Sequence, residues 1–113
     1  MSKLARLIAQ EEGFGIPGAL PTRNHNPGDL RHSPHSQHPG DPNAIGVIDN
    51  DADGWADLEH QLQLYAQRGT TLVQLVEMYA PPFENDTARY LKFICDGLGL
   101  GPGTMVAEAL QIP

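Results

Sequence analysis

The sequence predicts one mainly α-helical domain with a long Pro/Gly-rich loop and at most a minor β element, and three observations predict it. The 113 residues are 40% hydrophobic and 19% charged, which is typical of a globular chain that can build one modest core. Apolar residues recur at helical spacing near the N-terminus and again beyond residue 50. Prolines and glycines are concentrated between residues 13 and 46, where no long helix fits. We therefore expect residues 1–113 to form a single domain.

The first helix is predicted over residues 2–12. Apolar side chains repeat at helical spacing within it, at Leu4, Ala5, Leu7 and Ile8. Ser2 is a suitable N-cap, and Gly13 a suitable stop. Residues 13–43 contain six prolines, so we expect an irregular loop there. Residues 44–48 are a short β-like run, which fits a small hairpin or a lone strand.

Four further helices are predicted after the loop, each between a capping residue and a helix breaker. The longest, near 51–68, carries large side chains on one face, at Trp55, Leu58, Leu62 and Tyr65. The others are expected from Thr70 or Thr71 to Tyr79, from Thr87 to Asp96 after an Asn85 or Asp86 cap, and from Thr104 to Leu110.

The chain is acidic, with a formal net charge of −7. It contains no Lys/Arg cluster that could neutralise phosphates, so we expect no nucleic-acid partner. The charge also disfavours tight electrostatic binding to anionic cell-wall polymers. Any such substrate would have to be held by short-range contacts.

The apolar runs and the single Cys95 restrict where the protein acts. No run approaches the roughly 20 apolar residues that a membrane span needs. The N-terminus has no signal-peptide pattern, so we expect synthesis in the cytoplasm and a separate route for any action outside, as a virion component or by delivery to the periplasm or cell wall. One cysteine excludes an internal disulfide, and Cys95 fits a small buried hydrophobe.

The main candidate for chemistry is a carboxylate where the first helix meets the loop. Glu12 lies in the last predicted turn, where the helix dipole disfavours a negative charge. Burial beside a cleft would raise its pKa further, so the group could act as a general acid near neutral pH. Glu11 points about 100° away around the helix and is expected to face solvent. The alternative is that both are surface glutamates that end an amphipathic helix.

Three segments carry a family resemblance: IAQEEGFGIPGALPTRNHNPGDLR at 8–31, DGWADLEHQL at 53–62 and LVQLVEMYAPPFENDTARYLKFI at 72–94. Together, and in this order, they resemble the small lysozyme-like or lytic-transglycosylase-like domains of bacteriophage and prophage proteins. In that family a glutamate at the end of the first helix is the catalytic acid, which Glu12 matches. The chain departs from the family at two places: Gly13 replaces the serine of a Glu-Ser pair, and Asp29 replaces the last residue of Asn-Pro-Gly-Asn.

The resemblance implies a lysozyme-like fold and cleavage of the β-1,4 bond between N-acetylmuramic acid and N-acetylglucosamine in peptidoglycan. Glu12 would protonate the glycosidic oxygen, and either the sugar's own 6-hydroxyl or a water would complete the reaction. The implied partners are peptidoglycan glycan strands and, for a virion component, other virion proteins, with no cofactor. The alternative is a non-catalytic phage or prophage structural or glycan-binding module with the same fold, which the acidic charge and Asp29 favour.

Three asparagines and two tyrosines are candidates for holding the sugar. The amides of Asn24 and Asn26 could bond N-acetyl and hydroxyl groups. Asn26 and the Pro-Gly after it equally fit a plain turn. Tyr79 and Asn85 belong to a region that packs beside the catalytic helix in the family, and the Tyr90 hydroxyl could reach Glu12 across the cleft. The alternative is that Asn85 only caps a helix and Tyr90 fills the core.

Two metal-like patterns are weaker, and we expect no resident metal. The acidic run from Asp49 to Asp57 matches the start of an EF-hand loop, but His60 stands where the bidentate glutamate should fall. An acid-rich helix N-terminus explains this run better. The loop histidines, at His25, His32, His35 and His38, have no cysteine beside them and fit a solvated loop.

Overall fold

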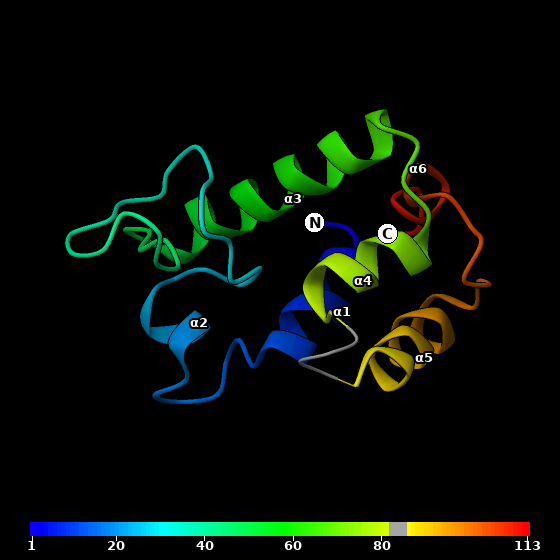
Figure 1. Ribbon diagram of the computed structural model, residues 1–113, viewed down its shortest axis with the longest axis horizontal. Helices are drawn as coiled ribbons and strands as arrows, with labels where there is room; N and C mark the ends of the chain where they lie inside the picture. The colour runs from blue at the N-terminus through cyan, green and yellow to red at the C-terminus, as the bar shows by residue number, and fades with distance from the viewer. Residues whose placement is uncertain (82–85) are drawn as a thin grey trace.

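Six helices and their connecting loops make up the described part of the chain (Figure 1). The computed structural model describes residues 1–81 and 86–113. In chain order the helices are α1 (Lys3–Glu12), α2 (Leu20–Arg23), α3 (Asp51–Gln67), α4 (Leu72–Tyr79), α5 (Thr87–Leu98) and α6 (Val106–Ala109). These residues contain no strand, so the prediction of a mainly α chain is confirmed. None of the described helices is long and apolar enough to cross a membrane.

The helices end where local chemistry predicts. Ser2 caps α1 through its side-chain oxygen, and Gly13 ends it in the left-handed conformation with a φ of 90°. The side chains of Asn50, Thr71 and Asp86 accept hydrogen bonds from backbone N–H groups at the starts of α3, α4 and α5. The caps at Ser2, Thr71 and Asp86 were among those predicted, because capping depends only on neighbours in the sequence.

Two predictions within the loop region need correction. The chain between the first and third helices includes one helical turn, α2, with Pro21 in its first turn, where a missing N–H costs no hydrogen bond. A single turn has too few residues for a periodic pattern. The β-like run at 44–48 forms no strand, since only Val47 pairs, in an isolated antiparallel bridge with Gln37.

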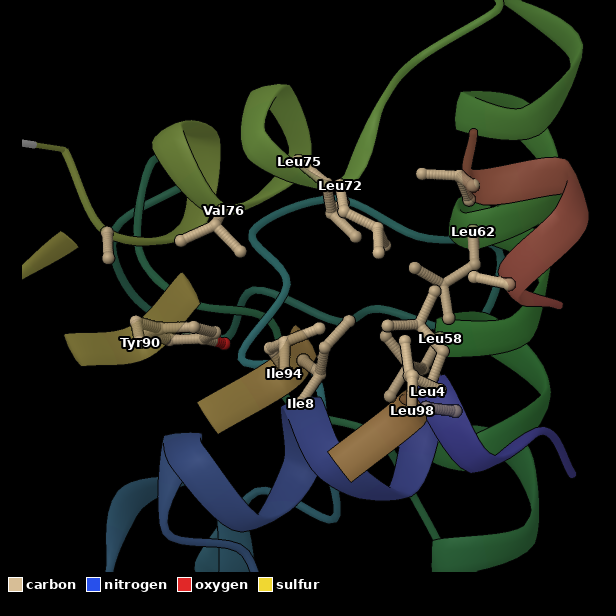
Figure 2. Close-up of a cluster of buried hydrophobic side chains, with 14 residues drawn as sticks. Leu4, Ile8, Leu58, Leu62, Leu72, Leu75, Val76, Tyr90, Ile94 and Leu98 are labelled. Atoms are coloured by element: carbon tan, nitrogen blue, oxygen red, sulfur yellow. The ribbon is translucent and has the colours of Figure 1, made fainter. Parts of the chain in front are cut away.

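One hydrophobic core joins five of the helices, and Figure 2 shows its side chains. Its largest members come from α1, α3, α4 and α5, at Leu4, Ile8, Leu58, Leu62, Leu72, Leu75, Val76, Ile94 and Leu98. Helix α1 packs against α5 and α3, and α4 packs against α5. Tyr90 of α5 belongs to the same cluster and is only 5% exposed. This packing brings the C-terminal end of α1 beside the first turn of α5.

The loop between α2 and α3 is held in place by a buried amide. Asn26 is fully buried, and its Nδ2 donates to the carbonyls of Leu30 and Gly46 at 2.8 and 2.9 Å. Its Oδ1 accepts from the backbone N–H of Leu30 at 3.0 Å. One side chain therefore ties together two stretches of loop that have no regular structure of their own.

A buried carboxylate anchors the histidine-containing part of this loop to α3. Asp57 is 1% exposed and accepts from the Ser33 hydroxyl at 2.6 Å and from the His35 backbone N–H at 2.9 Å. Its other oxygen lies 2.6 Å from His35 Nδ1. The side-chain hydrogen bond to Asp57 is the main cause that raises the pKa of His35. His35 is exposed to solvent, as expected for this loop, but its ring is held by Asp57. Among the described residues, no group of three His, Cys, Asp or Glu side chains is arranged to hold a metal ion.

Candidate active site

A cleft of about 620 Å³ opens beside the C-terminal end of α1. Its walls come from the loop after Asn26, from α3 and from the end of α4, and they include Glu12, Asp29, Arg31, Gln61, Tyr65 and Tyr79. The volume lies within the roughly 300–1,000 Å³ that is typical of small-molecule sites. The cleft therefore offers carboxyl, amide, guanidinium and aromatic groups to one ligand.

Glu12 is the most strongly perturbed acid of this cleft. Burial is the main cause, and the nearby charges of Asp29 and Glu11 act in the same direction. Together they raise the pKa of Glu12 from 4.5 to about 7, although a hydrogen bond from Tyr90 opposes the shift. The Tyr90 hydroxyl donates to Glu12 Oε2 at 2.9 Å, so the expected approach of these two side chains is present. Near neutral pH a large share of Glu12 holds a proton that it can deliver.

The neighbouring glutamate has a different environment from the one we predicted. Only 9% of the Glu11 side chain is exposed, so the expectation that it faces solvent is wrong. Both of its oxygens accept from the Arg89 guanidinium, at 2.7 and 2.9 Å. This bidentate pair joins α1 to α5 and holds Glu11 away from any acid role. Arg89 lies 78 residues further along the chain, and no local pattern in the sequence indicates the pairing.

A second carboxyl group, Asp29, shares the cleft with Glu12. Burial raises the pKa of Asp29, and the positive charge of Arg31 partly opposes this. Its backbone is left-handed, with a φ of 50°, a conformation that Asp tolerates better than most residues. Its Oδ1 is buried and has no hydrogen-bond partner among residues 1–81 and 86–113. The sequence indicates Asp29 only as an added charge and does not predict this isolated oxygen.

The predicted substrate-binding residues have four different outcomes. Tyr79 lines the cleft, its hydroxyl is buried without a partner among the described residues, and burial raises the pKa of that hydroxyl. Tyr90 contacts Glu12, as described. Asn26 uses its amide inside the loop, and Asn24 caps the end of α2, where its backbone carbonyl accepts from Ile48. Neither asparagine is among the residues that line the cleft. Asn85 lies outside the described residues.

Comparison of the chain with models of known protein families, with curated proteins and with solved structures finds no match in any of the three. The chemistry of the site therefore has to be inferred from its own groups. A proton donor with a pKa near 7 beside a cleft can assist the departure of a poor leaving group, such as an alkoxide.

Proposed function

We propose that the chain is a peptidoglycan-cleaving domain of the lysozyme or lytic-transglycosylase type. It would act on the β-1,4 bond between N-acetylmuramic acid and N-acetylglucosamine. The observation that supports this most is the partly buried carboxyl of Glu12 at the cleft, with a pKa raised to about 7. A general acid is most effective when its pKa lies near the working pH.

In this proposal Glu12 donates its proton to the glycosidic oxygen as the bond to the anomeric carbon breaks. The sugar ring then develops oxocarbenium character, and Glu12 becomes a carboxylate. The Tyr90 hydroxyl, which donates to Glu12 Oε2, favours this anion and also fixes the direction of the carboxyl group. Tyr90 is thus a positioning residue for the acid.

Short-range contacts would hold the glycan, because a net charge of −7 gives no general attraction to an anionic wall polymer. The cleft supplies two aromatic rings, Tyr65 and Tyr79, which present apolar surface to sugar rings. Gln61 and Arg31 add groups that can bond hydroxyl and N-acetyl oxygens. Asn26 would contribute indirectly, because its three hydrogen bonds shape the wall that carries Arg31.

The decisive experiment compares Glu12→Gln with Glu11→Gln on purified peptidoglycan, by zymogram and by loss of turbidity. The first substitution removes the proton donor and should reduce lysis by roughly 100-fold or more. The second removes a carboxylate one residue away that is paired with Arg89, and lysis should persist. Undiminished lysis by Glu12→Gln would end the assignment of Glu12 as the acid.

A second candidate function is a non-catalytic glycan-binding or virion structural module. The acidic charge favours it, since lytic action on anionic walls gains from a basic surface. In that case the wild-type protein would sediment with peptidoglycan without any lysis, and Glu12→Gln would sediment equally well. Lysis and sedimentation assays together therefore separate the two functions.

A further inference from the structure

Within the described part of the chain, two buried side-chain oxygens on residues of the same cleft have no hydrogen-bond partner. They are Asp29 Oδ1 and the Tyr79 hydroxyl, and both residues line the cleft together with Glu12. Buried polar atoms in folded proteins nearly always have a partner, so two exceptions in one cleft indicate a place for a ligand's polar group. A carboxylate oxygen accepts, whereas a phenol both donates and accepts. A bound water or hydroxyl group is the kind of partner that each of these oxygens lacks.

We propose that Asp29 is a second catalytic residue, which takes a proton from an attacking water, and that Tyr79 positions this water. This inference rests on the proposed function and deepens it. It assigns hydrolysis to the site, in place of attack by the sugar's own 6-hydroxyl.

The proposed step balances without any further reactant. The water oxygen forms a bond to the anomeric carbon, and one of its protons passes to the Asp29 carboxylate. The bond from the anomeric carbon to the glycosidic oxygen breaks, and its electron pair stays on that oxygen. Glu12 donates a proton to the same oxygen. Proton exchange with solvent then returns Glu12 to its acid form and Asp29 to its anion.

The surrounding charges favour these opposite protonation states. Arg31 stabilises the anion of Asp29, whereas Asp29 and Glu11 destabilise the anion of Glu12. Burial raises the pKa of both carboxyls, and at Asp29 the positive charge of Arg31 opposes this shift. Burial, together with the charges of Tyr65, Glu12 and Asp29, raises the pKa of Tyr79, so its hydroxyl stays neutral. Two carboxyls in different charge environments are suited to separate acid and base roles.

The backbone allows Asp29 to be replaced without loss of the fold. Its N–H donates to the Asn26 carbonyl at 3.0 Å, which closes the turn, and its φ of 50° suits asparagine at least as well as aspartate. Asp29→Asn thus removes the charge and keeps the shape. A matched control is Asp96→Asn, which makes the same change in net charge at an exposed residue paired only with Lys92.

The test digests purified peptidoglycan in water enriched in heavy oxygen and identifies the products by mass spectrometry. Wild type should release reducing muramic acid that carries the heavy oxygen. Asp29→Asn should slow this release by roughly 100-fold, whereas Asp96→Asn should not. Tyr79→Phe should lower kcat with little change in KM, because the hydroxyl contacts the water and not the sugar.

Two outcomes would overturn the inference and leave Glu12 as the acid: anhydro products from wild type, or full hydrolysis by Asp29→Asn. Absence of cleavage by wild type would instead end the proposed function, and this inference with it. A measurement without turnover gives a second check. The pKa of Glu12, followed by carboxyl NMR, should fall in Asp29→Asn because a like charge is removed, and an unchanged pKa contradicts the proposed pairing of the two acids.

Discussion

Replacing Glu12 with glutamine should stabilise the protein at neutral and alkaline pH. Burial is the main cause that raises the pKa of Glu12 from 4.5 to about 7, which means that folding disfavours its anion. At about 1.4 kcal/mol per pKa unit, this shift corresponds to at most roughly 3.5 kcal/mol. Solvent screening lowers the expected effect to about 2 kcal/mol, because the carboxyl borders an open cleft.

The stability difference should depend on pH in a defined direction. The folded state holds the Glu12 proton more tightly than the unfolded state, so wild-type stability falls as the pH rises from 4.5 to about 7. Above that range the wild type keeps the full loss of stability that comes from burying the Glu12 anion. Glutamine does not ionise, so the variant does not have this loss. The two proteins should differ little at pH 4 and by about 2 kcal/mol at pH 8, or roughly 6–10 °C in Tm.

Thermal unfolding of both proteins across this pH range measures the effect, and Glu11→Gln is the control. That variant loses the bidentate contact with Arg89, so its Tm should fall. Two adjacent glutamates would then respond in opposite directions. If Glu12→Gln has the same Tm as wild type at every pH, the Glu12 carboxyl is not desolvated and is not suited to be the proton donor.

Three further predictions concern residues around the site. Tyr90→Phe removes a hydrogen bond that lowers the pKa of Glu12, so the alkaline limb of the pH profile of lysis should move to higher pH. If that limb stays in place, Tyr90 only fills the core. Tyr79→Phe removes a buried hydroxyl that has no partner in the described chain, so urea unfolding should give equal stability or a gain of about 1 kcal/mol. A clear loss of stability would show that the hydroxyl is hydrogen-bonded. Asp57→Ala leaves the hydrogen-bond donors of Ser33 and His35 unpaired, so the free energy of unfolding should fall by about 3 kcal/mol. Amide hydrogen exchange at residues 33–38 should become faster. Unchanged exchange there would mean that other contacts hold the loop.

Local sequence signals are sufficient for most of the helical framework. Helical periodicity and capping involve residues at most a few positions apart, so the sequence alone indicates the roles of Ser2, Gly13 and Thr71. The same reasoning locates Glu12 in the last turn of α1. It fails for α2, which has a single turn, and for the run at 44–48, whose apolar residues pack without forming a ladder.

The hydrogen-bond and ion-pair partners of the side chains in and around the site depend on the tertiary structure. Glu11 and Arg89 lie 78 residues apart, and Asp57 meets His35 across 22 residues, so no spacing in the sequence indicates either contact. The sequence likewise leaves Asn26 as a turn residue or a sugar ligand, and its burial places all three of its bonds inside the loop.

The sequence by itself thus determined five of the six helices in the described residues and which glutamate ends the first of them. Only the tertiary structure shows that Glu12 is buried enough to have a pKa of about 7 and that Asp29 lines the same cleft. The physical reason is that helix formation and capping are local, whereas the pKa of a carboxyl depends on how much water the surrounding helices and loops exclude from it.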